Sequence, residues 1–296
     1  MKIVVTGREG QIARSLMEAG READHEIVTL GRPQLDLAAE PSQIHETLRA
    51  ARPDVIVSAA AYTAVDRAES EPTHAYAVNA KGAQSVARSA HLLGVPLIHL
   101  STDYVFDGAK FDPYFEEDPT DPRTVYGASK LAGEQFVLAA HHDSVILRTA
   151  WVFSPFGNNF VRSMLRLAAD RDGVGVVDDQ HGSPTSALDL SVAILSIADR
   201  LHSDPHDSLR GVFHLANSGH ASWAGLAEAV FTASHRSGGP VALVRPIRTD
   251  DYPTPAPRPA NSRLDCHLMS ARYGIGLGPW RDALDAVVDR LVHKAI

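Results

Sequence analysis

A tyrosine and a lysine four residues apart are the pair in this sequence best suited to chemistry. Tyr126 and Lys130 lie in the segment YGASKLAGE, residues 126–134, which has the pattern of a helix start. A spacing of i and i+4 places both side chains on one face of that helix. A phenol with a pKa of about 10 is a poor acid–base group near neutral pH. A nearby ammonium favours the phenolate and lowers this pKa, so we predict acid–base catalysis by Tyr126.

Polar residues that precede this pair are expected at the edge of a sheet. Ser101, Thr102 and Asp103 follow the apolar run 97–100, which predicts a strand. Open α/β sheets bind ligands beside the carboxyl ends of their strands, so these side chains are expected to face a ligand. A YxxxK match alone is common. Its place after this strand end and after a glycine turn disfavours the alternative of a packed tyrosine with an exposed lysine.

That glycine turn, near the N-terminus, offers a place for a cofactor that carries phosphate. Gly7 and Gly10 follow the first apolar run and open a helical segment that begins with Gln11 and Ile12. Glycines permit a tight turn and let the backbone approach a pyrophosphate, while the helix N-terminus supplies N–H groups. Two glycines alone are a weak motif. In a strand–turn–helix context, and with the YxxxK pair, they predict a nicotinamide-dependent short-chain reductase.

The end of the second predicted strand indicates which nicotinamide cofactor is preferred. An acidic residue there binds the ribose 2′-hydroxyl, whereas an arginine accommodates a 2′-phosphate. The strand ends in Leu30-Gly31-Arg32 with no acid, and Arg8 is a second arginine near the glycine turn. These residues favour NADPH, with NADH as the alternative if Arg32 is only a solvated loop residue. Further cofactor contacts are expected at Asp36, Leu37, Ala59, Ala60, Ala61 and Thr63.

The elements that position these residues follow from hydrophobic patterning. Over the first 150 residues, short apolar runs alternate with helical stretches, which predicts a parallel, doubly wound α/β sheet. The runs are continuous, as expected of strands covered on both faces. Strands are predicted at 3–5, 26–30, 55–57, 97–100, 145–147 and 212–215, and helices at 10–19, 42–51, 75–93 and 188–201.

A smaller second α/β domain is expected after Trp151, where the pattern changes. A helix is predicted at 160–169 and a strand at 175–177. Proline is dense over 240–259, as in some linkers, but the lack of Gly and Ser and the helical patterns on both sides favour an ordered loop facing the ligand. We predict a Rossmann-type nucleotide-binding domain and a smaller ligand-binding domain. Their predicted boundaries are 1–152 plus 186–221 for the first and 153–185 plus 222–296 for the second.

Composition excludes several classes of protein. The 296 residues are 44% hydrophobic and 22% charged, which is typical of a globular chain. The net charge of -8 gives no basic patch for nucleic acid. A single cysteine, Cys266, allows no intrachain disulfide and no zinc cluster, so we predict no metal site. Without a signal peptide or an apolar run long enough for a membrane span, we expect a cytoplasmic protein.

Together, the motifs resemble the dTDP-4-dehydrorhamnose reductase family of extended short-chain dehydrogenases/reductases. The resemblance implies reduction, by NADPH or NADH, of the C4 ketone of dTDP-4-dehydro-L-rhamnose to dTDP-L-rhamnose, with the sugar nucleotide in the smaller domain. The segments that carry it are 7–11, 59–69, 79–80, 101–106, 126–134, 148–153, 157–160, 179–180 with 182–185, and 252–264.

The same resemblance implies roles for individual residues. Tyr126 would donate the proton to the new hydroxyl, and Lys130 would tune it and hold the nicotinamide ribose. Thr102 and Asp103 would contact the sugar near the carbonyl. Trp151 would lie against the sugar, although a core aromatic after a strand is an equal alternative.

Two further features of the family bear on this sequence. Arg258 would suit the diphosphate, because a guanidinium binds phosphate through paired hydrogen bonds.

Some members bind magnesium through acidic residues at a dimer contact. Ser15 and Leu188 stand at those positions here, which argues against that metal site. A homodimer is therefore left open.

Two other functions are compatible with the same residues. One is 4-ketoreduction of a different dTDP-deoxysugar, as in antibiotic biosynthesis. The other, from a different class, is a cofactor-binding regulatory subunit similar to that of methionine adenosyltransferase.

Overall fold

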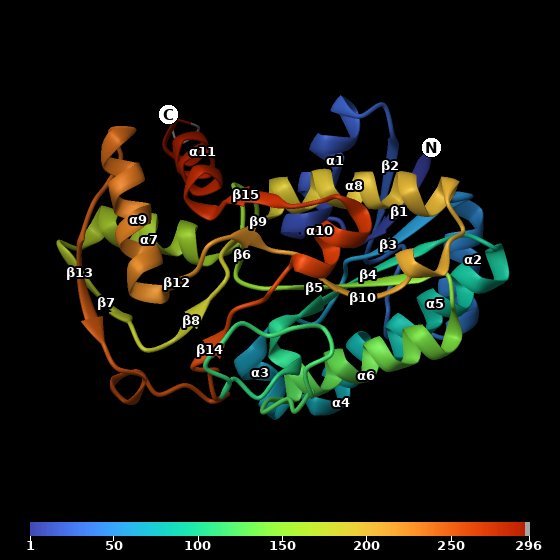
Figure 1. Cartoon of the computed structure of the whole chain (residues 1–296), viewed down its shortest axis with the longest axis horizontal. Coiled ribbons are helices and arrows are strands. Elements are labelled where there is room, and N and C mark those ends of the chain that lie inside the picture. Colours follow the sequence, from blue (N-terminus) through green and yellow to red (C-terminus); the bar gives the residue numbers. More distant parts are fainter. Residues whose placement is uncertain (294–296) are drawn as a thin grey trace.

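Six parallel strands form the central sheet, in the order β10-β5-β4-β3-β1-β2 (Figure 1). The structure, a computed structural model, describes residues 1–293. The order of connection reverses between β1 and β3, because the chain runs outward from them in opposite directions. This topology confirms the predicted doubly wound parallel sheet. The strands are β1 (Lys2–Thr6), β2 (Glu26–Leu30), β3 (Val55–Ser58), β4 (Leu97–Thr102), β5 (Ser144–Thr149) and β10 (Gly211–His214).

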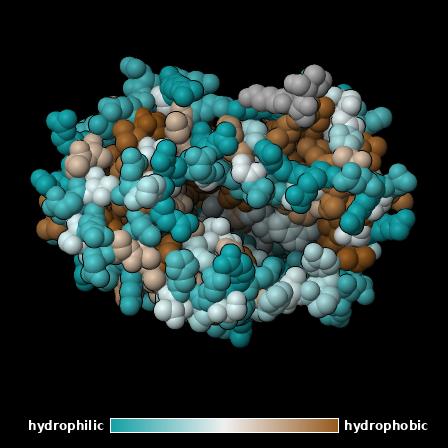
Figure 2. All heavy atoms as spheres, turned by 180° about the vertical axis from the view of Figure 1, so that it is seen from behind, coloured by the Kyte–Doolittle hydropathy of each residue, from teal (hydrophilic) through white to brown (hydrophobic). Residues whose placement is uncertain are grey.

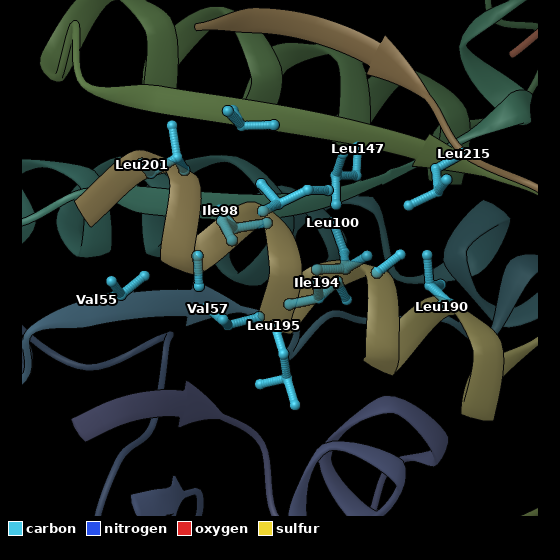
Figure 3. Close-up of a cluster of buried hydrophobic side chains, with 14 of the residues drawn as sticks. Val55, Val57, Ile98, Leu100, Leu147, Leu190, Ile194, Leu195, Leu201 and Leu215 are labelled. Carbon is cyan, nitrogen blue, oxygen red and sulfur yellow. The ribbon is translucent and has the colours of Figure 1, made fainter. Parts of the chain in front are cut away.

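Helices cover both faces of this sheet, which explains the continuous apolar runs. Along β1, Ile3 and Val5 belong to the hydrophobic cluster that includes α1 and α8, whereas Val4 belongs to the cluster on the α2 and α5 side. Because successive side chains point to opposite faces that are both covered, consecutive residues of β1 from Ile3 to Thr6 are all buried. Figure 3 shows the first cluster, where side chains of β3, β4 and β5 meet those of α8. The helices are α1 (Gln11–Glu22), α2 (Pro41–Ala51), α5 (Ala83–Leu93), α6 (Val125–Ala140) and α8 (Ala187–Ser203).

The helix predicted at 75–93 is interrupted by a wider turn. Residues Ala77–Gly82 are π-helical and separate α4 (Pro72–Tyr76) from α5. The wider turn contains Asn79, whose side chain lies between two other segments. It accepts from Tyr62 N at 2.7 Å and donates to Ser129 Oγ at 2.9 Å. The segment is thus fixed against α6, and such turns recur at functional sites. The short helix α3 (Val65–Ser70) precedes α4.

A second hydrophobic cluster lies beside the sheet. Its members include Phe153, Met164, Leu226 and Trp280, which come from the second half of the chain. Three helices and the parallel pair β7–β13 surround this cluster (Figure 1). These elements are α7 (Phe160–Asp170), α9 (Trp223–Arg236), α11 (Trp280–His293), β7 (Gly173–Val177) and β13 (Leu243–Ile247).

The proline-rich stretch 240–259 is not wholly the loop that the sequence predicted. Leu243–Ile247 form the strand β13, which pairs with β7 from Leu243↔Gly173 to Ile247↔Val177. Pro246 is accommodated because this ladder has only two strands, and an edge strand tolerates a missing N–H donor. The remaining short elements are β6 (Val152–Phe153), β8 (His181–Gly182), β9 (Thr185–Ser186), β11 (Asn217–Ser218), β12 (Ala221–Ser222), β14 (Asn261–Ser262), β15 (Leu277–Pro279) and α10 (His267–Tyr273).

The predicted domain boundaries stay a prediction. Met269 and Tyr273 of α10 pack into the cluster on the α1 and α8 face of the main sheet. The C-terminal part of the chain therefore contributes to both hydrophobic clusters.

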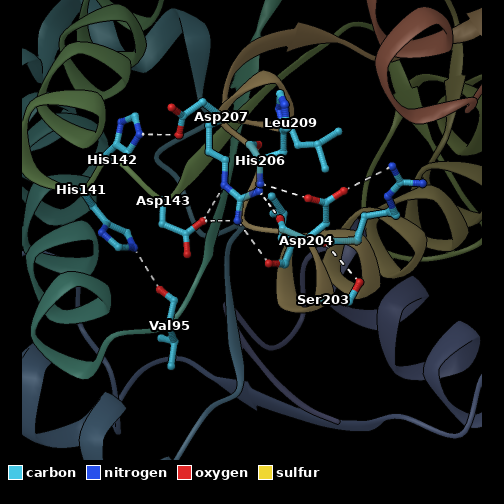
Figure 4. Close-up of polar contacts among 12 residues, drawn as sticks. Val95, His141, His142, Asp143, Ser203, Asp204, His206, Asp207 and Leu209 are labelled. Carbon is cyan, nitrogen blue, oxygen red and sulfur yellow. Dashed lines mark hydrogen bonds and ion pairs between the residues drawn. The ribbon is translucent and has the colours of Figure 1, made fainter.

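Polar contacts close the amino-terminal edge of the sheet (Figure 4). Arg210 forms an ion pair with Asp143 at 2.8 Å and donates to the carbonyl of Asp204 at 2.5 Å. His141 Nε2 lies 2.9 Å from the carbonyl oxygen of Val95. These contacts join the ends of β4, β5, α6 and α8.

The close approach of α6 to the π-helical segment yields a stability prediction. A Cβ atom at Gly133 would lie 2.2 Å from the carbonyl oxygen of Asn79. Alanine favours a helix over glycine by about 1 kcal/mol, but the backbone must move to admit the methyl group. We expect Gly133→Ala to lower the free energy of unfolding by about 1–3 kcal/mol, measured by urea denaturation. Gly276→Ala is the matched control, because its Cβ would meet nothing within 4 Å. Equal stability of the Gly133 variant and the unaltered protein would contradict this packing.

Candidate active site

The carboxyl ends of the central strands open into a cleft of about 860 Å³. The cleft continues to the second hydrophobic cluster, since Trp151 and Trp223 also line it. Figure 2 shows the molecule from behind, with a hollow near its middle. All predicted site residues except Arg258 line the cleft: Gly7, Gly10, Gln11, Ile12, Arg32, Asp36, Leu37, Ala59, Ala60, Ala61, Thr63, Thr102, Asp103, Tyr126, Lys130 and Trp151.

The glycine turn has the geometry that a pyrophosphate needs. Gly7 has a φ of 101°, a conformation that favours glycine. Gly10 precedes α1 in an extended conformation, and no side chain caps this helix end. Free N–H groups of the first turn therefore face the cleft, together with the positive end of the helix dipole. Thr6 Oγ1 accepts from Ala59 N and Ala60 N at 3.1 and 3.0 Å, which fixes the small-residue floor beside the turn.

The rim beyond β2 carries the residues expected at the adenine end. Arg32 and Asp36 are exposed there, and Leu37 is buried. Asp36 Oδ1 accepts from Ala38 N at 2.9 Å, which orders this loop. A guanidinium at an exposed rim is available to a phosphate group, so the geometry suits the 2′-phosphate that Arg32 was predicted to bind.

Helix α6 places Tyr126 in its first turn. Thr124 caps the helix, its Oγ1 accepting from Gly127 N at 3.0 Å. The Tyr126 ring meets Tyr104 edge-on, with centroids 5.5 Å apart. Burial raises the pKa of Tyr126 to about 12, against a smaller lowering effect of a hydrogen bond with Thr102. The sequence-based expectation of a lowered pKa is wrong for this state, because desolvation of the phenolate is the largest effect.

Lys130 is held by contacts with β4. Its Nζ donates to the carbonyl of Leu100 at 2.6 Å and lies 3.4 Å from His99 Nε2. His99 Nδ1 in turn lies 3.0 Å from Ser58 Oγ. Burial lowers the pKa of Lys130 to about 8, while the charge of Glu134 opposes this effect. The ammonium is therefore easier to deprotonate than an exposed lysine.

A buried ion pair fixes α6 against the sheet. Glu134 and Arg148 lie 2.7 Å apart with side chains 3% and 5% exposed, so their charges interact with little screening by water. Ser101 Oγ, at the end of β4, donates to the same carboxylate. Sequence reasoning missed Glu134, although its position four residues after Lys130 places it on the same helical face.

Asp103 lines the cleft, and hydrogen bonds of Thr102 and Ser262 lower the pKa of its carboxyl against the larger effect of burial. Thr102 Oγ1 donates to Asp103 Oδ1 at 2.8 Å. Within residues 1–293, Oδ2 is buried without a hydrogen-bond partner. Burial raises the pKa of this carboxyl to about 6. An unpaired buried oxygen is costly, so its position favours a ligand that brings a hydroxyl donor.

Two stacked indoles line the part of the cleft beside the second hydrophobic cluster. The rings of Trp151 and Trp223 are 8° from parallel, with centroids 3.5 Å apart. Trp151 has a φ of 47°, in the left-handed region that non-glycine residues seldom adopt. A Cβ at Gly182 would lie 2.2 Å from the Trp151 ring, so this stack requires glycine there. Trp151 lines the cleft and also packs against the second cluster, as a core aromatic would, and its predicted contact with the sugar stays a prediction. Sequence reasoning missed Trp223.

Comparison with known proteins agrees with this geometry. The profile of the family described as RmlD substrate binding domain matches residues 1–293. The chain is 53% identical to a dTDP-4-dehydrorhamnose reductase of Sinorhizobium fredii over 97% of both chains. It is 43% identical to the dTDP-4-dehydrorhamnose reductase of Burkholderia thailandensis, over 99% of this chain and 100% of that one.

The chain belongs to the dTDP-4-dehydrorhamnose reductase family.

A solved member of the dTDP-4-dehydrorhamnose reductase family has the same fold. The enzyme of Bacillus anthracis, solved in complex with NADP, is 35% identical, with a TM-score of 0.90 over 97% of this chain and 98% of that one. Family membership confirms the predicted resemblance.

Arg258 does not line the cleft of this dTDP-4-dehydrorhamnose reductase family member. It forms an ion pair with Asp66 at 2.7 Å and donates to the carbonyl of Ala256 at 3.0 Å. It thereby ties the proline-rich loop to α3. Its predicted contact with a diphosphate stays a prediction.

The two positions at which the family resemblance implied magnesium ligands in some members are occupied here by Ser15 and Leu188. Ser15 is buried in α1, and Leu188 packs against the second hydrophobic cluster. Within residues 1–293, no group of three His, Cys, Asp or Glu side chains is arranged to hold a metal ion.

The burial of Asp103 predicts a pH-dependent stability difference. Its pKa is raised from 3.8 to about 6 on folding, so the folded protein retains this proton to a higher pH than the unfolded chain. Ionisation therefore destabilises the fold above pH 6, and the effect disappears below pH 4. We expect Asp103→Asn to have the stability of the unaltered protein near pH 4 and to exceed it by up to about 3 kcal/mol at pH 7.5. Urea denaturation at both pH values measures this. A pH-independent difference would contradict the burial of the charged form.

Proposed function

We propose that this protein is an NAD(P)H-dependent dTDP-4-dehydrorhamnose reductase, which reduces the C4 ketone of dTDP-4-dehydro-L-rhamnose to dTDP-L-rhamnose. One observation carries the proposal. Thr102, Asp103, Tyr126 and Lys130 line the same cleft as the uncapped end of α1, in a chain that matches a reductase of that name over 97% of its length.

The residues of the cleft fit a nicotinamide cofactor, which supplies a hydride when bound. The N–H groups at the start of α1 would hold the pyrophosphate, and Ala59 to Ala61 would lie against the ribose. Arg32 at the rim would hold a 2′-phosphate, so we propose NADPH as the preferred cofactor and NADH as the alternative. The Bacillus anthracis relative was solved with NADP, which supports this choice.

Tyr126 supplies the proton. With a pKa of about 12, the phenol is protonated at neutral pH and can donate to the substrate oxygen as negative charge develops there. Thr102 Oγ1, which donates its hydrogen to Asp103 Oδ1, would have to turn that hydrogen toward the same substrate oxygen to bind it. The Lys130 ammonium, which donates to the Leu100 carbonyl, would stabilise the phenolate left behind if its side chain turned toward Tyr126. Asp103 Oδ2 would accept a hydrogen bond from a sugar hydroxyl.

Two other functions make different demands on this site. A 4-ketoreductase for another dTDP-deoxysugar would use the same residues and differ only in its sugar contacts. A regulatory subunit similar to that of methionine adenosyltransferase would need the cofactor site without turnover. The reductase names of close, full-length relatives favour the proposed reaction.

The cellular location and the binding partners of the protein are also proposals. Within residues 1–293, no helix combines the length and the hydrophobicity needed to cross a bilayer. We propose a cytoplasmic enzyme whose partner is the dTDP-sugar, and a membrane or nucleic-acid partner is not expected. The homodimer stays a prediction from the family resemblance.

The proposed function predicts turnover of one substrate. The purified protein should oxidise NADPH, followed by absorbance, when dTDP-4-dehydro-L-rhamnose is added, and chromatography should show dTDP-L-rhamnose as product. A dTDP-4-keto sugar that differs at another carbon is the control and should react more slowly. No oxidation with the rhamnose precursor would reject the proposal, and faster turnover of the control would favour the other sugar.

A single substitution tests the proton donor. Tyr126→Phe removes the phenol hydroxyl, so we expect kcat to fall by at least about 100-fold. The Kd of NADPH, measured by calorimetry, should change by less than a factor of about three. Tyr76→Phe, at a more exposed position on α4, is the matched control and should retain full activity. Near-normal kcat in the Tyr126 variant would contradict its role.

A further inference from the structure

Gln11 joins two parts of the cleft that are far apart in the sequence. It is the first residue of α1 and lines the cleft within the glycine turn. Its side-chain amide makes three hydrogen bonds, each to the segment 152–159. Nε2 donates to the carbonyl of Val152 at 3.1 Å. Oε1 accepts from Ser154 Oγ at 2.8 Å and from Asn159 Nδ2 at 3.0 Å.

The segment 152–159 is ordered around the same contacts. Asn159 Nδ2 also donates to the carbonyls of Ser154 and Phe156, at 2.9 and 3.2 Å. Asn159 Oδ1 accepts from Arg162 N at 3.2 Å and so caps α7. The Gln11 amide is thereby connected to the start of α7, on the substrate side of the cleft.

A second contact between α1 and the same segment supports the first. The Phe156 ring lies between two guanidinium groups, with Arg14 of α1 at 4.6 Å and Arg290 of α11 at 4.9 Å from its centroid. Arg290 Nη2 also donates to Glu18 of α1 at 2.6 Å. Cations over an aromatic face are attracted to it, so α1 and α11 both hold the segment. The segment's position is therefore set from α1, the helix whose N-terminus would hold the cofactor.

We propose that Gln11 is a positioning residue that sets the separation between the cofactor and the substrate. This inference rests on the proposed function. Backbone N–H groups beside Gln11 would hold the pyrophosphate, while its amide holds the segment that follows Trp151. A change of about 1 Å in the placement of two reactants can cost about 100-fold in rate. Loss of the amide should therefore lower turnover more than the binding of either ligand alone.

Gln11→Met tests this inference, because methionine keeps the side-chain length and removes all three hydrogen bonds. We expect kcat to fall by at least roughly tenfold. The Kd values of NADPH and of dTDP, each measured alone by calorimetry, should change by less than about twofold. Gln43→Met, at an exposed position of α2, is the matched control and should leave kcat unchanged. An unaltered kcat in the Gln11 variant, or a loss confined to NADPH affinity, would overturn the proposal.

Ser154→Ala tests the contact from its other end, and also serves if the Gln11 variant fails to fold. Ser154 does not line the cleft, and its hydroxyl contacts Gln11 and, within the segment, Phe156 N at 3.1 Å, so its effect on turnover would act through these contacts. We expect a several-fold fall in kcat that largely disappears when the substitution is made in the Gln11→Met background. Fully additive effects, or no effect of Ser154→Ala alone, would count against the inference. Absence of turnover by the unaltered protein would count instead against the proposed function.

Discussion

The arrangement of the active site depends on the buried ion pair between Glu134 and Arg148. It joins α6, which carries Tyr126 and Lys130, to β5, and through Ser101 it also holds the end of β4. Two charges in a nearly dry interior are stable only together, since removing one partner leaves the other unpaired at a cost of about 3–5 kcal/mol. The pair therefore fixes α6, β5 and the end of β4 relative to one another, and this fixes the positions of the side chains that these elements contribute to the cleft.

Desolvation is the largest influence on the pKa values of three titratable side chains in the cleft. Burial raises the pKa of Tyr126 to about 12 and of Asp103 to about 6, and lowers that of Lys130 to about 8. The phenol is thus kept as an acid, and the lysine is kept within reach of deprotonation. The same fold that excludes water from the sheet edge assigns these protonation states.

Much of the fold could be predicted from local pattern. The strands of the main sheet follow from apolar runs, and residues such as Thr102 were found because they follow a strand directly. Contacts between side chains that are far apart in the sequence could not be predicted from local pattern. The partner of Arg258, the orientation of Lys130 and the π-helical turn at Asn79 depend on side chains from other elements. The strand β13 could not be predicted from local pattern, because Pro246 disfavours a strand unless that strand lies at the edge of a sheet.

The stacked indoles give the molecule an optical property. The sequence contains three tryptophans, and two of them, Trp151 and Trp223, form the stack at the cleft. The third, Trp280, is buried in the second hydrophobic cluster with Arg281 over its ring. Two nearly parallel indoles in contact couple their electronic transitions, and two of the three indoles of the protein therefore absorb from the wall of the cleft. The protein carries its own spectroscopic probe of the cleft, and no label has to be introduced.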